Sequence, residues 1–254
     1  MPLNKREILK CNPHKVIFAR PSPITRITSV NKGLRRINKK LKMELINPLV
    51  QEYAEKFSSA EDVLLKEVAD FTIANHPEHQ MLSGHLQGKF LEMASMMIRP
   101  RRILEIGTFT GYSALCLAKG LTDDGLLHTI ELREDDAATA KGFFDRSVYK
   151  EKIILHTGDA KKIVSILDET LDLVFIDADK PGYIEYFNLV FPKVRKNGFI
   201  FADNIFFHGE AIEAEPKGKN GKAIKEFNEF INKRTDIEKM ILTLRDGLYL
   251  IRKK

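Results

Sequence analysis

A regular alternation of short aliphatic strands and helical segments, beginning at about residue 101, constrains the fold more than any other feature. The strand-like runs are RRILEI, LLHTIE, KIILHT, LDLVFID and NGFIFAD, and the helix-like segments between them are YSALCLAKGL, EDDAATAKGFFDR, AKKIVSIL and YIEYFNLVFPKV. Strands and helices that alternate at this spacing form parallel βαβ units, whose helices cover both faces of one sheet. We therefore expect an α/β fold.

The two ends of this region follow other patterns. Between residues 43 and 100, apolar residues recur at helical spacing in PLVQEYAEKF, SAEDVLLKEVADFTIANH and GHLQGKFLEMASMMI, with Ser59 placed as the N-cap of the second helix and Pro100 ending the third. After the helical segment KAIKEFNEFINKR, the Asp246–Gly247 turn predicts an antiparallel hairpin. We expect one domain over residues 43–254, with a helical cap (43–100) and an α/β core (101–254).

The net charge of +6 belongs entirely to the N-terminal tail. Residues 1–42 hold 12 Lys/Arg and one acid, which leaves 41 − 12 = 29 basic and 35 − 1 = 34 acidic residues, or −5, for the rest. The prolines and basic residues of the tail predict a disordered extension. An organelle-targeting peptide and a nucleic-acid-binding arm are the functional alternatives, and we favour an extension unrelated to the fold.

Cysteine content and hydropathy narrow the class of protein. No apolar run approaches the roughly 20 residues that a bilayer span requires, so we expect a soluble protein with no membrane partner. Cys11 and Cys116 lie far apart and no CxxC motif occurs, which argues against a disulfide framework and a zinc site. A reducing compartment fits this pattern, and we expect the protein to be cytoplasmic.

The loop after the first strand reads LEIGTFTGYSAL. A dinucleotide fingerprint starting at Gly107 would need glycines where Phe109 and Tyr112 stand, so a turn that holds a pyrophosphate is not expected. The acid Glu105 followed by Gly107 and by Gly111 instead suits close approach of the backbone to a ligand without a diphosphate.

Acids also end the second and third strands. Glu131 stands at the tip of HTIE and Asp159 follows HTG, so both fall at the strand edge that already holds Glu105. A carboxylate at the tip of the second strand can accept hydrogen bonds from both hydroxyls of a ribose. Three acids at one edge predict a neutral or cationic nucleoside ligand. The alternative is that each acid caps the helix that follows it.

These motifs resemble a known family. The pattern E-x-G-x-x-x-G, with acids ending the next two strands, is similar to class I S-adenosylmethionine-dependent methyltransferases. Together with FIDADKPGY and FADN, it resembles the caffeoyl-CoA and catechol O-methyltransferases, including their bacterial members, from about Met81 to the C-terminus. The resemblance implies a Rossmann-like, mostly parallel sheet with an antiparallel C-terminal hairpin, and S-adenosylmethionine as methyl donor.

The family's cofactor site, transferred by motif, falls on residues from five segments of this chain. The resemblance implies Ser83, Gly107, Thr108 and Ser113 at the methionine portion, Glu131 at the ribose, Asp159 and Ala160 at the adenine, and Glu105 and Asp179 lining the pocket near the amino group.

The same resemblance implies a metal site. Asp177 ends the fourth strand and Asp203 and Asn204 end the fifth, and adjacent strands lie about 4.8 Å apart, so these side chains can converge. Two carboxylates and an amide suit Mg²⁺ best, with Mn²⁺ or Ca²⁺ as alternatives, and Zn²⁺ poorly. The alternative is a simple turn at Asp203–Asn204. Strand alternation further predicts that Asp177 and Asp179 share one side of the strand.

The implied reaction is O-methylation of a small aromatic acceptor with two adjacent hydroxyls, catechol-like or hydroxycinnamoyl. A divalent cation would lower the pKa of those hydroxyls, with Asp177 holding the metal and Lys180, at the family's general-base position, taking the proton. The family is commonly dimeric, so a homodimer is expected.

Two other functions compete with this interpretation. Methylation of a hydroxylated tRNA nucleobase is favoured by the basic tail and opposed by the −5 charge of the remaining chain. A non-catalytic nucleoside-binding module would not need the metal ligands and the lysine. Where plant enzymes tend to carry a second asparagine the chain has His208, and the divergent loop 205–221 leaves the acceptor open.

Overall fold

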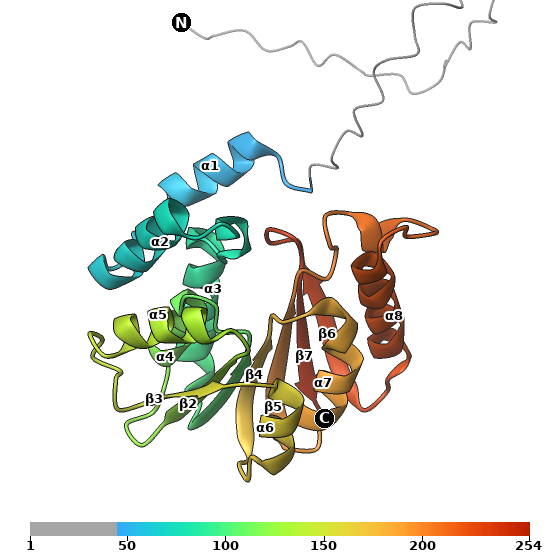
Figure 1. Ribbon diagram of the computed structural model, residues 1–254. Helices are drawn as coiled ribbons and strands as arrows, with labels where there is room; N and C mark the ends of the chain where they lie inside the picture. Colours follow the sequence, from blue (N-terminus) through green and yellow to red (C-terminus); the bar gives the residue numbers. More distant parts are fainter. Residues whose placement is uncertain (1–44) are drawn as a thin grey trace, which may run out of the picture. The chain divides into compact units, whose positions relative to one another are not determined.

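A seven-stranded sheet forms the centre of residues 45–254, the part of the chain that this computed structural model describes (Figure 1). Its strand order is β3-β2-β1-β4-β5-β7-β6. Strands β1 to β5 pair in parallel, and β7 is antiparallel to both β5 and β6. The expected fold class is confirmed. The strands are β1 (Arg102–Ile106), β2 (Leu126–Glu131), β3 (Ile153–Thr157), β4 (Leu171–Ile176), β5 (Val194–Asp203), β6 (Ile237–Leu242) and β7 (Leu248–Lys253).

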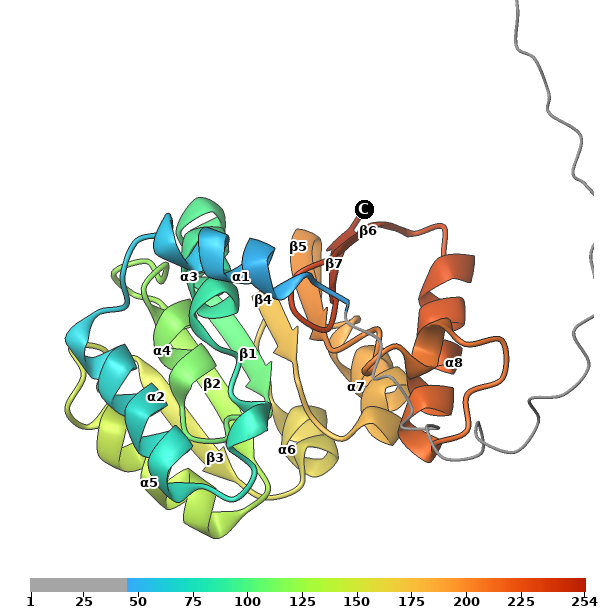
Figure 2. The same cartoon turned by 90° about the horizontal axis from the view of Figure 1, so that it is seen from above.

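The helices cover both faces of the sheet (Figure 2). Helices α2 to α5 pack in the hydrophobic cluster of one face, and α6 to α8 pack in the cluster of the other. Three short 3₁₀ turns, η1 to η3, lie in the connections. The bounds are α1 (Pro48–Lys56), α2 (Val63–Asn75), η1 (His79–Met81), α3 (His85–Ile98), α4 (Tyr112–Ala118), α5 (Glu134–Phe144), α6 (Ala160–Ile166), η2 (Lys180–Gly182), α7 (Tyr183–Val190), η3 (Glu210–Ile212) and α8 (Lys219–Lys233).

Helix α2 begins later than its sequence suggests. Asp62 is the N-cap, and its Oδ1 accepts a hydrogen bond from the Leu65 amide at 2.9 Å, so the prediction of Ser59 as N-cap is wrong. The carbonyl of Ser59 is instead bound by His85 Nε2 at 2.7 Å. Because aspartate caps as well as serine does and directly precedes the apolar run, the helix begins at Val63.

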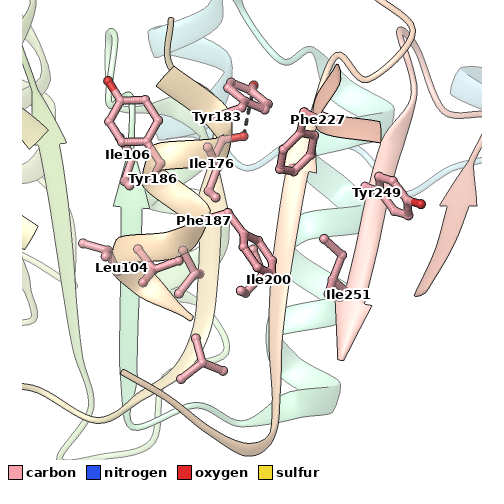
Figure 3. Packing of buried hydrophobic residues seen from close by; sticks show 14 of the residues in the cluster. Leu104, Ile106, Ile176, Tyr183, Tyr186, Phe187, Ile200, Phe227, Tyr249 and Ile251 are labelled. Carbon is pink, nitrogen blue, oxygen red and sulfur yellow. Dashed lines mark hydrogen bonds between the residues drawn. The ribbon is translucent and has the colours of Figure 1, made fainter. Parts of the chain in front are cut away.

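Aromatic side chains fill the space between the sheet and α7 and α8. Figure 3 shows Tyr183 and Phe187 of α7 and Phe227 of α8 beside strand residues that include Ile176 and Ile200. The rings of Tyr183 and Phe227 meet edge to face with centroids 5.3 Å apart. Because helices cover both faces of the sheet, most residues of β1 and β4 are apolar, with Arg102, Glu105 and Asp172 as the exceptions.

The expectations for the ends of the chain have different outcomes. The Asp246–Gly247 turn lies in the connection between β6 and β7, which form the expected antiparallel hairpin. The tail, residues 1–42, lies outside the described residues, so its disorder and the domain boundary at Met43 stay predictions. None of the helices between residues 45 and 254 combines the length and the apolar character that crossing a membrane requires.

Candidate functional site

A pocket of about 1470 Å³ lies where the carboxyl ends of β1 to β5 meet the N-terminal helices and the β6–β7 hairpin tip. The strand order reverses between β1 and β4, and this reversal is where open parallel sheets bind their ligands. Most of the residues predicted from the sequence line this pocket: Ser83, Gly107, Thr108, Ser113, Glu131, Asp159, Ala160, Asp177, Asp179, Lys180 and Asn204. Glu105 and Asp203 do not line it.

Gly107 brings the loops after β1 and β4 into direct contact. Its φ is 101°, and a Cβ atom added there would lie 2.0 Å from the carbonyl oxygen of Asp177. The Asp177 amide donates to the carbonyl of Ile106 at 2.9 Å, and the Gly107 amide donates to Ile130 at 2.9 Å. Only glycine fits this position, and the floor of the pocket is therefore made of main chain.

Glu131 is held against the pocket wall by main-chain donors. Its Oε2 accepts a hydrogen bond from the Phe109 amide at 2.7 Å, and its Oε1 accepts one from the Arg133 amide at 3.0 Å. A carboxylate oxygen can accept more than one hydrogen bond, so capacity for ligand hydroxyls remains. The arrangement suits a ribose, and the role of Glu131 stays a prediction.

The alternative that the acids only cap helices holds for one of the three. Asp159 is exposed and caps α6, accepting a hydrogen bond from the Lys161 amide at 2.9 Å. Helices α4 and α5 have Gly111 and Arg133 as N-caps, so neither Glu105 nor Glu131 caps the helix after it.

Glu105 lies behind the pocket wall, which differs from the prediction that it lines the pocket. It is still part of β1, ahead of the turn at Gly107, and its fully buried side chain accepts a hydrogen bond from Thr129 on β2. Its Oε1 has no partner among residues 45–254. Burial, together with the negative charge of Asp177, raises the pKa of Glu105 to about 8.

Lys180 joins the ends of β4 and β5 at the pocket surface. Its Nζ donates to Asp177 Oδ1 at 3.0 Å, to Asn204 Oδ1 at 2.9 Å and to the Tyr183 hydroxyl at 2.7 Å. The Tyr183 hydroxyl in turn donates to the carbonyl of Asp203 at 2.9 Å. The side chains of Lys180 and Asp177 are 11% and 20% exposed, and both residues line the pocket, so most of the pair is shielded from solvent.

Asp177 and Asp179 do not share one side of a strand. Strand β4 ends at Ile176, and Asp179 is the N-cap of η2, where it accepts hydrogen bonds from the Gly182 amide and the Tyr186 hydroxyl. The alternation argument is wrong here because the chain leaves the sheet one residue earlier than the sequence predicts. Both carboxylates still line the same pocket.

Asp203 is fully buried beneath Asn204 at the end of β5. Its Oδ1 accepts a hydrogen bond from the Asn204 amide at 2.8 Å, and its Oδ2 accepts one from Gln87 Nε2 of α3 at 2.7 Å. Burial raises the pKa of Asp203 to about 7, and the negative charge of Asp177 adds to the rise.

The donor set fits a hard cation in chemical type. No group of three or more His, Cys, Asp or Glu suited to a metal ion occurs among residues 45–254; the predicted set is two carboxylates and one amide. The Oδ1 atoms of Asp177 and Asn204 already converge on one positive charge, the Lys180 ammonium. Oxygen donors of this kind suit Mg²⁺ or Ca²⁺. A metal ion here stays a prediction.

Sequence reasoning missed two residues of this network. Gln87 is buried, lines the pocket and binds Asp203, but a lone polar residue on a helix gives no sequence signal of its partner 116 positions away. Tyr183 follows Lys180 by three residues, the spacing at which side chains meet on a helix, so the motif KPGY could have indicated it.

The loop after β5 is fixed to the β6–β7 hairpin tip. The amides of Ile205 and Phe206 donate to the carbonyls of Gly247 and Asp246 at 3.1 and 3.0 Å, and the His208 amide donates to Asp246 Oδ1 at 2.8 Å. His208 lines the pocket. This loop therefore has a defined position beside Asn204.

Comparison with known proteins agrees with this geometry. The O-methyltransferase family model matches residues 55–254. A probable caffeoyl-CoA O-methyltransferase 1 from Dictyostelium discoideum is 31% identical over 213 residues, which cover 82% of this chain and 93% of that protein. A catechol O-methyltransferase from Niastella koreensis is 33% identical over 62% of this chain and 73% of its own.

Solved structures show the same fold. The crystal structure of an SAH-bound methyltransferase from Podospora anserina superposes with a TM-score of 0.75 at 29% identity, covering 81% of this chain and 94% of that one. The family match spans most of the pocket lining, from Glu55 to the hairpin tip, and only lining residues between 45 and 51 precede it. The chain therefore belongs to the O-methyltransferase family.

Proposed function

We propose that the protein transfers a methyl group from S-adenosylmethionine to one hydroxyl of a small aromatic diol, catechol-like or hydroxycinnamoyl, with the assistance of a divalent cation. The observation that carries this proposal is the contact between the loops after β1 and β4. It places a main-chain cradle at Gly107 beside the cluster of Asp177, Lys180 and Asn204 in one pocket.

The half of the pocket formed by β1 to β3 suits the methyl donor. Glu131 has remaining capacity for ribose hydroxyls, and Ala160 is buried at the start of α6, where the adenine is expected. The relative from Podospora anserina, described as SAH-bound, supports the same type of cofactor.

Asp177, Asp203 and Asn204 are the residues that would hold the cation, with Mg²⁺ favoured by their oxygen donors. When bound, such an ion lowers the pKa of adjacent hydroxyls and orients them. Lys180 is the proposed base: its Nζ faces the pocket between Asp177 and Asn204, and in its neutral amine form it would take the proton from the attacking hydroxyl and become the ammonium. The oxygen then accepts the methyl group and the sulfonium becomes a neutral thioether.

The names of the relatives favour a small aromatic acceptor over a tRNA nucleobase. The −5 charge of residues 43–254 points the same way, because RNA-binding surfaces are usually basic.

The test combines calorimetry with turnover. We expect S-adenosylmethionine to bind with or without Mg²⁺, and a catechol to be methylated only with the metal, so that removal by a chelator abolishes turnover and added Mg²⁺ restores it. Asp203→Ala should abolish turnover while changing cofactor affinity by less than about tenfold, because Asp203 is separated from the cradle.

Two controls complete this experiment. Asp203→Asn preserves the shape of the buried side chain, and melting curves of both variants separate the loss of a ligand from loss of the fold. Loss of cofactor binding in a folded Asp203→Ala variant would contradict the proposal that the cofactor and the metal ion bind at adjoining but separate sites. Full turnover in the presence of a chelator would contradict the metal.

A further inference from the structure

One arginine in the pocket has no carboxylate partner among residues 45–254. The other Arg and Lys side chains that line the pocket each form an ion pair, whereas Arg245 forms none in this part of the chain. The pairs are Arg133 with Glu78 and Asp136, Lys161 with Glu185, and Lys180 with Asp177. A pocket-lining cation that forms no ion pair can bind an anionic group of a ligand.

Arg245 lies in the half of the pocket on the side of Asn204, which we call the acceptor half because the methyl acceptor is proposed to bind there. It lies at the β6–β7 hairpin tip, which is fixed to the loop after Asn204 by the hydrogen bonds of Ile205 and Phe206. Its Nη2 donates to the carbonyl of Gln80 at 2.7 Å, so the side chain reaches from the hairpin to the η1 turn. Most of the guanidinium donors remain available.

The backbone of Arg245 is strained. Its φ is 52°, in the left-handed region that glycine adopts without cost and arginine does not. Strain of this kind persists where surrounding contacts impose it, and it clusters at ligand-binding positions. A glycine would hold this turn more easily, so the arginine side chain is the feature that needs a functional explanation.

The acids of the same half of the pocket have other partners. Glu55 of α1 accepts a hydrogen bond from Gln51, and Asp246 accepts one from the His208 amide. Neither forms an ion pair with Arg245. Among the Arg and Lys side chains that line the pocket, the Arg245 guanidinium is therefore the one that an incoming anionic group meets without displacing a paired carboxylate in the described residues.

We propose that Arg245 binds a carboxylate of the methyl acceptor, and that the acceptor is an aromatic diol bearing a free acid rather than a coenzyme A thioester. The inference rests on the proposed function. A guanidinium binds a carboxylate with two parallel hydrogen bonds. The single unpaired cation matches one carboxylate, whereas the several phosphate charges of coenzyme A would leave most of their charge uncompensated.

The first experiment uses acceptors that differ only in charge. 3,4-Dihydroxybenzoate and 3,4-dihydroxybenzamide share ring and size, so the ratio of their kcat/KM values reports the carboxylate alone. We expect the protein to prefer the benzoate by roughly 10- to 100-fold, the range of a charge-assisted hydrogen bond. Caffeate should likewise be preferred to caffeoyl-CoA, which distinguishes a carboxylate from a phosphate as the bound anion.

The variants locate the preference. Arg245→Gln and Arg245→Gly should both bring the benzoate-to-benzamide ratio close to one. Because Arg245→Gly also removes the left-handed strain, it should melt no lower than the original protein, so loss of preference cannot be assigned to misfolding. Arg101→Gln, at the opposite end of the sheet, is the matched control and should leave the ratio unchanged.

The outcomes separate this inference from the proposed function. An unchanged ratio in both Arg245 variants, or a preference for caffeoyl-CoA over caffeate, would overturn it. If none of the acceptors is methylated, the proposed function fails, and calorimetry with 3,4-dihydroxybenzoate decides the inference alone. Binding that is at least tenfold weaker in Arg245→Gly would support the carboxylate site, and equal binding would refute it.

Discussion

At the scale of single residues, we expect replacement by alanine to have opposite effects on stability at Gly107 and at Gly142. Gly107→Ala would push a Cβ against the Asp177 carbonyl at a φ of 101°, so we expect a loss of roughly 2 kcal/mol or more of unfolding free energy. Gly142 lies inside α5 with no atom within 4 Å of an added Cβ, so Gly142→Ala should gain roughly 0.5–1 kcal/mol. Urea denaturation measures both, and equal effects of the two substitutions would contradict the close contact at Gly107.

The same scale shows what a sequence can reveal about a site. Asp177, Lys180 and Asn204 follow strands within recognisable motifs, and the structure brings them together as expected. The partner of Asp203, by contrast, is Gln87 on a distant helix, and only tertiary packing decides that contact. Glu105 was predicted to line the pocket, but β1 continues to Ile106, so Glu105 is still within the strand and lies behind the pocket wall.

At the scale of elements, two neighbouring strands carry a histidine pair, of which His128 is buried and His156 is half-buried. His128 of β2 and His156 of β3 are joined by a ring-nitrogen hydrogen bond of 3.0 Å, on the face where Glu169, itself bound to Arg102, lies 3.8 Å from His128. Burial lowers the pKa of both, and for His128 the charge of its partner adds to this. The folded state therefore takes up protons less readily than the unfolded state.

This pair should make stability dependent on pH. Its contribution is complete above the unfolded pKa of about 6.5 and is lost as the pH falls below it, by about 1.4 kcal/mol per unit of pKa difference. Glu105 and Asp203 have raised pKa values, so they stabilise the folded state as the pH falls and oppose the effect of the histidines. The histidine contribution is therefore measured as the difference in pH dependence between a variant and the original protein. Between pH 7.5 and 5.5, the double substitution His128→Gln, His156→Gln should lose less stability than the original protein. The exposed His79→Gln is the control, and parallel curves for the double variant would refute the effect.

Element types were predictable where one local signal dominated. Runs of β-branched and aliphatic residues marked β1 to β4 closely, because buried parallel strands leave little room for polar residues. The start of α2 could not be predicted in this way, because serine and aspartate are equally good caps. Only the contacts of the folded state select Asp62 over Ser59. The early end of β4 before Asp177 likewise depends on the contact with Gly107, which no local pattern encodes.

At the scale of the whole molecule, α1 exposes an apolar face. Helix α1 has no buried residue, and Leu49, Tyr53 and Phe57 are 74%, 66% and 67% exposed. A nine-residue helix is marginal in water without packing partners, and exposed apolar patches mark association surfaces. We propose that this face joins two copies of the chain in the homodimer that the sequence led us to expect.

Sedimentation measures this association. The protein should sediment as a dimer at micromolar concentration, and Tyr53→Glu should shift it to a monomer. Val148→Glu replaces an apolar side chain outside α1 that is even more exposed than Tyr53, and it should leave the mass unchanged. A dimer that survives Tyr53→Glu, or a monomeric original protein, would contradict the interface.

The contact at Gly107 also divides the pocket into halves with different capacity for change. The donor half lies at the ends of β1 to β3, and Gly107 there packs against the main chain of Asp177, so substitutions at this contact disturb the sheet itself. The acceptor half is built from side chains of the N-terminal helices, the loop after β5 and the hairpin tip, which can vary without moving a strand. In evolution, a lineage of such chains can exchange one acceptor for another by drift in these segments while the methyl donor stays the same.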